Sequence, residues 1–182
     1  MTRAHRRLVR ANGVDLCVET FGDASSPALL LIAGAASSMD WWEDELCERL
    51  ASGPRFVVRY DQRDTGESVS YVPGAPGYTG ADLAADAVAL VDALAIDRSH
   101  LVGMSMGGGV AQHATLRFPE RVASLTLIST SLAAPGTPER AELPPPSDEL
   151  RALLADPPKP PDWSDREAVI DLPFSDKGST EM

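Results

Sequence analysis

The sequence is poor in several residue types, and each shortage narrows what the chain can do. It has two cysteines and three histidines in 182 residues, and neither Cys17 nor Cys47 has a second cysteine or a histidine at metal-ligand spacing. We therefore expect free thiols and no metal site. Lysine and arginine (16) are outnumbered by aspartate and glutamate (27), which gives a formal net charge of −11. This charge disfavours binding to nucleic acid or to an anionic membrane.

Long apolar runs are absent as well. No stretch approaches the roughly 18 apolar residues that cross a membrane. The basic first residues are not followed by the apolar core of a signal peptide. We therefore expect a cytoplasmic protein with no membrane partner, long enough to form one domain with a sizeable core.

Strand-like and helix-like segments alternate through the first 131 residues. Asn12-Gly13, a strong hairpin signal, separates segments 8–11 and 14–21, which predicts an antiparallel hairpin at a sheet edge. Strands alternating with helices imply right-handed crossovers and a mostly parallel sheet with flanking helices, an α/β fold whose site lies at the carboxyl ends of the strands. Further strands are expected at 28–32, 55–60 and 122–128, the first and last of them buried.

Three helices are expected between these strands. Asp40 can cap the first helix, and Thr79 with Asp82 forms a capping box for the second. The third follows Ser105 and ends before Pro119. We interpret the pair Trp41-Trp42 as packing residues, with a platform for a ligand as the alternative. In the first helix the apolar residues at spacing four, which should face the core, are Trp42, Leu46 and Leu50.

The segment Gly103-Met104-Ser105-Met106-Gly107 joins a strand to a helix, which is the setting of the G-x-S-x-G nucleophile elbow. Such a turn exposes the Ser105 hydroxyl, and Gly103 and Gly107 avoid clashes between a Cβ atom and neighbouring backbone. The Met106 N–H, at the helix N-terminus, faces the place where an oxyanion forms. The alternative is a glycine-rich turn without catalytic function. The glycine motifs of phosphate-binding loops do not fit these residues.

The character of the sequence changes after Ser131. Nine of the fifteen prolines lie between Pro135 and Pro161. Short helices are expected at 148–155 and 165–172, but no strand. We predict a core domain at residues 1–131 and a proline-rich, partly disordered cap or lid segment at 132–182. The alternative for this second segment is a disordered linker.

Three stretches carry a family resemblance: RYDQRDTGES at 59–68, HLVGMSMGGG at 100–109 and FPERVASLTLIST at 118–130. Over residues 6–131 the chain resembles the α/β-hydrolase-fold superfamily, of the serine ester hydrolase kind, and within it the aclacinomycin methylesterase group. The resemblance implies a carboxylic ester hydrolase with a small-molecule ester substrate, no cofactor and a Ser-His-Asp triad. Dehalogenases and epoxide hydrolases of this fold carry Asp at the elbow instead of serine.

The resemblance also assigns individual residues. Ser105 matches the nucleophile, and the backbone N–H groups of Met106 and Ala35 match the oxyanion hole. Residues of the loop after segment 55–60 resemble a loop that orders the floor of the site by hydrogen bonding rather than by contact with substrate: Asp61, Arg63, Gly66 and Ser68.

The other two members of the triad have no counterpart. His5 lies at the terminus, His100 begins the elbow strand at its far end from Ser105, and His113 lies about 12 Å along the helix. None is expected to reach the Ser105 hydroxyl. No Asp or Glu stands at 129–131, where the family can place the acid. We therefore expect a chain that lacks the last third of the family fold and is nearly inert alone.

Two alternatives follow from this gap. The chain is either an inactive hydrolase-like fragment or a module that binds or complements another polypeptide. A sheet that ends at segment 122–128 also exposes the edge of that strand, which predicts self-association.

Overall fold

A computed structural model describes residues 6–72, 74–132, 147–156, 165 and 167. The chain divides into two compact units, Met1–Thr137 and Pro138–Met182. The first unit is built on a sheet of six strands. The strands are β1 (Arg7–Ala11), β2 (Val14–Phe21), β3 (Ala28–Ile32), β4 (Phe56–Tyr60), β5 (Ser99–Met104) and β6 (Val122–Ile128). The helices of this unit are η1 (Met39–Trp41), α1 (Asp44–Ala51), α2 (Gly80–Ala93), α3 (Met106–Arg117) and η2 (Pro119–Arg121).

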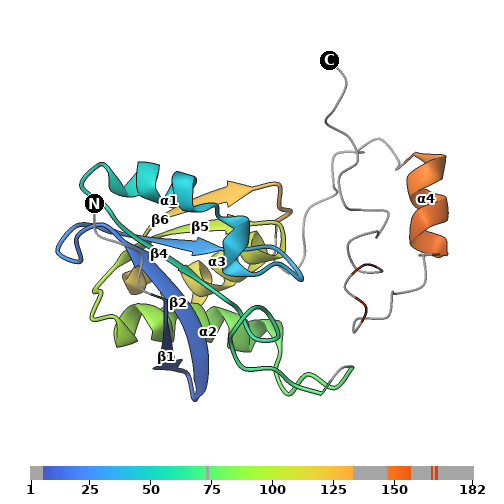
Figure 1. The fold of residues 1–182 in the computed structure, drawn as a ribbon, viewed down its shortest axis with the longest axis horizontal. Helices are drawn as coiled ribbons and strands as arrows, with labels where there is room; N and C mark the ends of the chain where they lie inside the picture. Colours follow the sequence, from blue (N-terminus) through green and yellow to red (C-terminus); the bar gives the residue numbers. More distant parts are fainter. Residues whose placement is uncertain (1–5, 73, 133–146, 157–164, 166, 168–182) are drawn as a thin grey trace. The chain divides into compact units, whose positions relative to one another are not determined.

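The strand order is β1-β2-β4-β3-β5-β6 (Figure 1). The hairpin β1-β2 turns at Asn12-Gly13, where both residues have positive φ, and it pairs antiparallel with β4. Strands β4, β3, β5 and β6 pair parallel with one another. The carboxyl ends of β3, β4 and β5 therefore meet at one edge of the sheet. This agrees with the predicted α/β class, its edge hairpin and its mostly parallel sheet.

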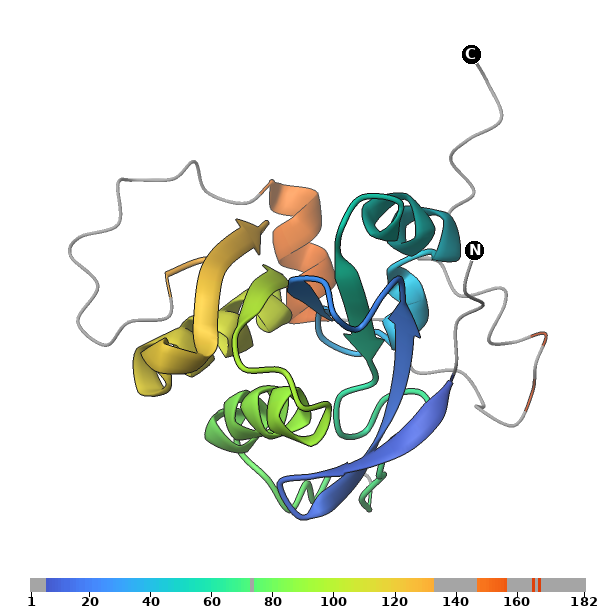
Figure 2. The same ribbon diagram turned by 90° about the vertical axis from the view of Figure 1, so that its left-hand side faces the viewer.

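Helices cover both faces of the sheet, so that it separates two apolar cores. Helices α2 and α3 pack side by side on one face (Figure 2). Their buried side chains, such as Leu90 and Val110, contact Leu30, Val58 and Leu101 of the strands. Helix α1 covers the other face with a smaller core (Figure 1). Burial from both sides explains why the central strands read as nearly continuous apolar runs.

The second helix begins as the sequence predicts. Thr79 is the N-cap of α2, and its side chain and that of Asp82 form the reciprocal capping box. The Asp82 carboxylate accepts hydrogen bonds from the Thr79 backbone N–H at 2.8 Å and from its hydroxyl at 2.7 Å. Such a cap stabilises a helix by about 1 kcal/mol.

The predicted start of the first helix is wrong. Of the three residues expected to face the core, Trp42 and Leu50 do so but Leu46 does not. Asp40 lies inside the short turn η1 and does not cap α1, which begins at Asp44 with Glu43 before it. Leu46 is 41% exposed, and Cys47 occupies the buried position instead. The separate turn shifts the helix by several residues, and apolar spacing alone did not reveal that shift.

The prediction that segment 122–128 is buried is also wrong. Its bounds are those of β6, but most of the strand is exposed, including Leu127 at 43% and Ile128 at 38%. Within the described residues β6 is the outer strand of the sheet and pairs with β5 alone. Neighbouring elements therefore cover only part of its apolar surface.

The second unit contains helix α4 (Asp148–Ala155), with the bounds expected from the sequence. Nearly all of the helix expected at 165–172, and most of the predicted cap segment, lie outside the described residues. In the part of the chain that the structure describes, no helix is both long and apolar enough to cross a membrane.

Candidate functional site

Ser105 lies on the sharp turn between β5 and α3, as its motif predicts. Its backbone has φ 51° and ψ −118°, a conformation that non-glycine residues rarely adopt and that costs about 1–3 kcal/mol. The Ser105 N–H donates to the Ile128 carbonyl at 2.9 Å, so the turn is anchored to β6. The side chain is exposed, and α3 begins at the next residue.

The glycines on either side of Ser105 are required by close backbone contacts. A Cβ atom on Gly103 would collide with the Gly107 carbonyl, and a Cβ on Gly107 would collide with the carbonyl oxygens of Ile32 and Ala33. The end of β3, the end of β5 and the start of α3 are thus packed backbone to backbone. Side chains at these two positions would push the turn away from the sheet.

The loop after β3 lies against this turn. Ile32 pairs with Gly103 across the sheet, and a methyl group built on Gly34 would lie 3.6 Å from Ser105 Cβ. Ala35 follows Gly34 and is exposed, as are Ser105 and Met106. The fold therefore brings together the predicted nucleophile and the residues that carry both predicted oxyanion donors. The first N–H groups of α3 have no intrahelical acceptor and carry the positive end of the helix dipole.

Asp61, directly after β4, holds two loops at the sheet edge. It is 1% exposed, and its carboxylate accepts from the Met39 N–H at 2.7 Å and the Glu67 N–H at 2.8 Å. The Ser68 hydroxyl donates to the Asp61 carbonyl at 2.7 Å and accepts from the Cys17 N–H at 2.8 Å. Both oxygens of the carboxylate are used by the backbone, which supports the structural role that the resemblance implied for this loop.

The next residue, Gln62, fixes the loop that carries Ala35. Its side chain is 2% exposed, and its amide N–H donates to the Ala33 carbonyl at 3.0 Å. Sequence analysis did not identify Gln62 as part of the site. Its position, two residues after the end of β4 and so near the end of β3, could have indicated this role.

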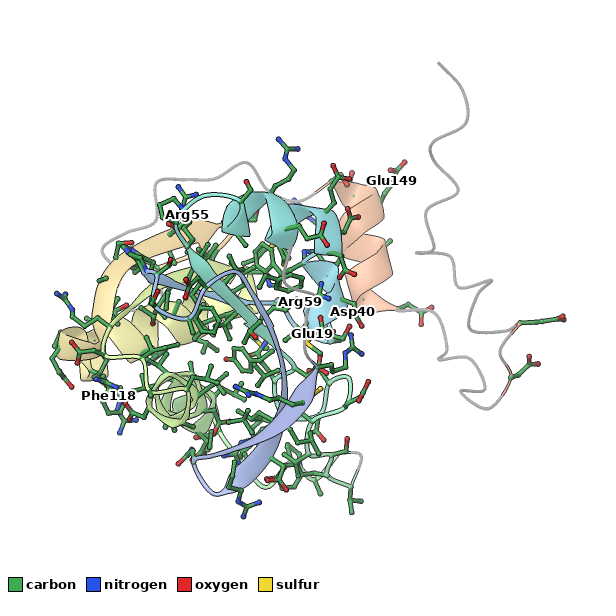
Figure 3. The ribbon with its side chains drawn as sticks, turned by 60° about the vertical axis from the view of Figure 1, so that its left-hand side comes forward. Glu19, Asp40, Arg55, Arg59, Phe118 and Glu149 are labelled. Atoms are coloured by element: carbon green, nitrogen blue, oxygen red, sulfur yellow. The ribbon has the colours of Figure 1, made fainter. Side chains whose placement is uncertain are left out.

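Arg59 is a second residue that sequence analysis missed. It is 2% exposed on β4, and it donates to Glu19 of β2, to Asp44 of α1 at 2.5 Å and to the Trp42 carbonyl. Figure 3 shows Arg59, Glu19 and Asp40 close together at this point. Burial by itself lowers the pKa of Arg59, but hydrogen bonds to the two carboxylates outweigh it, and the pKa is raised. An arginine within the apolar run FVVRY was the signal of this buried ionic cluster.

Arg63 belongs to a second cluster, with Asp86 and Tyr71. Its guanidinium donates to both carboxylate oxygens of Asp86 on α2, each at 2.7 Å, and to the Tyr71 hydroxyl at 3.1 Å. The hydrogen bonds with Asp86 raise the pKa of Arg63. This bidentate pair links the loop after β4 to α2. It also occupies guanidinium N–H groups of Arg63 that could otherwise bind a substrate.

The described histidines lie away from Ser105. His100 is the second residue of β5, about 16 Å from Ser105 along the strand, and its Nδ1 shares a 2.7 Å hydrogen bond with the Ser124 hydroxyl. His113 lies eight residues into α3, about 12 Å along its axis. His5 lies outside the described residues. Among the described residues no group of three or more His, Cys, Asp or Glu side chains could hold a metal ion.

The arrangement has the parts for binding an acyl group and stabilising an oxyanion. The exposed residue Ser105, on a strained turn, stands beside a helix N-terminus and a second loop in which Ala35 is exposed. Proton transfer needs a further group, because the described imidazoles lie too far from Ser105 Oγ to act as its base.

Comparison with known families and proteins agrees with this geometry. A family model described as the alpha/beta hydrolase fold matches residues 27–175. Rhodomycin D methylesterase of Streptomyces sp. (strain C5) is 43% identical over 122 residues, which cover 67% of this chain and 41% of that protein. The rhodomycin D methylesterase of Streptomyces peucetius is 36% identical over 159 residues, which cover 81% of this chain and 53% of that protein. The chain thus spans about half the length of these relatives, or less.

Solved structures show the same architecture. The crystal structure of epoxide hydrolase A from Mycobacterium thermoresistibile matches with a TM-score of 0.63 and 28% identity, covering 69% of this chain and 39% of that one.

Proposed function

Because the chain belongs to the α/β-hydrolase fold family, we propose that it provides the nucleophile and the oxyanion hole of a carboxylic ester hydrolase. Ser105 is the nucleophile, and the N–H groups of Met106 and Ala35 bind the oxyanion. One observation carries this proposal: Ser105 is exposed, has a strained backbone and immediately precedes α3, and the loop residue Gly34 lies against it. The likeness to the two rhodomycin D methylesterases supports an ester as the substrate.

The chemistry follows from these positions. Ser105 Oγ attacks the ester carbonyl carbon and loses its proton to a base, while the carbonyl π electrons move to the oxygen. The two N–H groups hydrogen-bond the resulting oxyanion, an interaction worth about 3–4 kcal/mol per donor in acyl-transfer enzymes. Collapse of the intermediate breaks the bond to the alcohol, which takes up the proton, and water then releases the acid from Ser105.

We propose that the base comes from outside the described residues. The placement of His100 and His113 supports this, because neither imidazole lies within hydrogen-bond reach of Ser105 Oγ. Without a base and its orienting acid, such a site retains only about 10³- to 10⁴-fold acceleration over water. We therefore propose that the described residues alone form a poor catalyst, which a further polypeptide segment can complete.

Active-site labelling tests this function. The chain is treated with a fluorophosphonate, alone and together with a separately produced polypeptide covering the part of the Streptomyces peucetius methylesterase beyond its match to this chain. We expect little labelling of the chain alone and stoichiometric labelling of Ser105 after complementation. Peptide mass spectrometry locates the label. Ser124, which is exposed and hydrogen-bonded to His100, is an internal control that lacks an oxyanion hole.

Each other outcome has a definite meaning. Label on Ser124, or label that persists in Ser105→Ala, contradicts the assignment of the nucleophile. Rapid stoichiometric labelling of Ser105 in the chain alone contradicts an external base. Complex formation without labelling favours the alternative of a binding or complementation module.

The exposed outer strand suggests a further partner. We propose that two copies of the chain associate through β6, because within the described residues this strand pairs with β5 alone and also exposes apolar side chains. The segment Val122–Ile128 contains no charged residue and no proline, the residue types that protect sheet edges.

A further inference from the structure

The Ala33 carbonyl oxygen is a contact point between three segments at the sheet edge. Ala33 directly follows β3, and the side-chain amide of Gln62, in the loop after β4, donates to its carbonyl at 3.0 Å. A Cβ atom on Gly107, in the first turn of α3, would collide with the same oxygen. Gln62 is therefore bound to an atom that also packs against the helix that begins after Ser105.

The position of this oxygen relates the two proposed oxyanion donors to each other. Ala35 lies two residues after Ala33, and Met106 lies directly before Gly107. The peptide unit between Ala33 and Gly34 is planar, so a fixed carbonyl also fixes the Gly34 nitrogen. Only the two backbone torsions of Gly34 then separate this plane from the plane that carries the Ala35 N–H. Because glycine restricts its own torsions least, the direction of that N–H depends on neighbouring contacts.

Gln62 is suited to fix the Ala33 carbonyl because it is itself held in place. It is buried, and the backbone N–H and the hydroxyl of Thr65 donate to its own carbonyl at 3.2 Å and 2.9 Å. Its side-chain oxygen Oε1 has no hydrogen-bond partner among the described residues. Within that part of the chain, the bond to Ala33 is thus the one hydrogen bond of the side-chain amide, and a substitution can test it alone.

We propose that Gln62 is a positioning residue of the oxyanion hole, which sets the direction of the Ala35 N–H relative to the Met106 N–H through the Ala33 carbonyl. Donors that are oriented before the reaction stabilise an oxyanion without reorganising. Gln62 acts through Ala33 rather than on the reacting atoms. The inference rests on the proposed function for the role of the two N–H groups, but the orientation of the peptide between Gly34 and Ala35 can be measured without any reaction.

Residual dipolar couplings, measured by NMR on the intact chain, test this orientation. Gln62→Met keeps a side chain of similar length but removes the donor, so it should change the couplings of the Gly34 and Ala35 N–H groups and shift the Ala33 carbonyl carbon signal. The couplings of α2 should stay unchanged.

Gln62→Glu separates hydrogen bonding from packing. Its carboxylate cannot donate to the Ala33 carbonyl, but the protonated acid can. Burial raises the pKa of a carboxyl group, so the acid should form as the pH falls from about 8 to about 5. We expect the couplings of Gly34 and Ala35 to return toward the parent values over this range. A side chain that only fills space would give no such recovery, because protonation leaves its volume unchanged.

Gln112→Met is the matched control. Gln112 is also buried, and its side-chain amide donates to the Ser131 carbonyl at 2.9 Å and to the Gly108 carbonyl at 3.2 Å. Its substitution removes the same chemical group from α3 and should leave the couplings of Ala35 unchanged.

Trp41 provides a reference signal at the end of β5. It is 58% exposed whereas Trp42 is 6% exposed, so the sequence-based interpretation of both as packing residues holds for Trp42 alone. The Trp41 indole N–H donates to Met104 Sδ at 3.2 Å. This indole signal should stay in place in Gln62→Met, because the loss of the Ala33 bond should not move β5.

The rate at which the fluorophosphonate labels Ser105, in the presence of the complementing polypeptide, gives the effect on function. We expect Gln62→Met to slow labelling about tenfold or more, since the loss of a whole donor costs about 10²- to 10³-fold. Gln112→Met should label at the parent rate.

The two measurements distinguish failure of this inference from failure of the proposed function. Unchanged Ala35 couplings in Gln62→Met, no recovery of Gln62→Glu at low pH, or equal labelling rates in Gln62→Met and the parent would overturn the positioning role. Changed couplings together with no labelling of Ser105 in the complemented parent would contradict the hydrolase, and would retain Gln62 as the residue that orients the Ala35 N–H.

Discussion

The β5–α3 turn has the loops after β3 and β4 on one side and the outer strand β6 on the other. The two sides differ in how many of their polar groups and apolar side chains have partners among the described residues. On the loop side, buried Asp61 and the β4 residue Arg59 hydrogen-bond with backbone and carboxylate partners from several elements. Strand β6 exposes Leu127 and Ile128 instead. The comparison indicates that contacts within the described residues fix the loop side of the turn, while the β6 side leaves apolar side chains exposed.

Substitution of Gly103 should give the largest loss of stability, because Gly103 lies where the turn is packed backbone to backbone. In Gly103→Ala the new Cβ meets the backbone of Gly107 and Gly108, which cannot move without displacing α3. We expect a loss of at least about 3 kcal/mol in the free energy of unfolding, measured by urea denaturation.

Gly109, the fourth residue of α3, provides the matched control. Apart from its chain neighbours and the backbone of its own helix, a Cβ there meets no atom within 4 Å, so Gly109→Ala should stabilise the protein by about 0.5–1 kcal/mol through helix propensity. Equal effects of the two substitutions would show that the backbone contact at Gly103 is not a constraint.

Asp61→Asn should have the next largest effect. The amide replaces one acceptor with a donor that faces either the Met39 or the Glu67 N–H, and the site is buried. We expect a loss of about 2–3 kcal/mol. Asp97→Asn is the control, because its side chain is 94% exposed with an ion pair to Arg121 at 3.3 Å, and it should change stability by less than about 0.5 kcal/mol. A similar small loss for both would contradict the role of Asp61 in holding the two loops.

Much of the fold could be predicted, because the sequence patterns that indicate its strands, helices and turns involve residues close together in the sequence. The bounds of β3 and β6 follow from short apolar runs, and α2 follows from its capping box. The turn at Ser105 follows from a spacing of glycines that only close backbone packing requires. These features depend on residues adjacent in sequence, and each prediction was confirmed in position.

The parts that sequence did not reveal depend on distant partners. Met39 is bound by Asp61 and Trp42 by Arg59, and these contacts separate η1 from α1. No local pattern encodes them. The exposure of Leu127 could not be predicted for the same reason, because it depends on distant elements. The sequence of an apolar strand is similar whether or not neighbouring elements cover the strand.

On the β6 side the expected effect is on association rather than on folding. Leu127→Lys places a charge on the exposed edge and should shift sedimentation velocity profiles toward monomer. The free energy of unfolding should change by no more than about 0.5 kcal/mol. Leu8→Lys on β1, a strand that already carries Arg7 and Arg10, should leave the profile unchanged. A monomeric parent chain, or equal responses of the two variants, would contradict pairing through β6.

The smallest expected effect concerns the thiols beneath the polar loops. Cys17 and Cys47 are buried and free, and burial raises the pKa of each thiol from its ordinary value of 9.0 to about 11. The folded state therefore keeps both protons when the unfolded chain releases them, so stability is complete below about pH 8.5 and falls as the pH rises toward 11. Urea midpoints measured between pH 8 and pH 10 should decline, and the decline should be shallower in Cys17→Ala/Cys47→Ala. The slope that remains in this variant includes buried Tyr60, whose pKa is also raised by burial. An identical slope in the two proteins would mean that the thiols ionise as easily in the folded chain as in the unfolded one.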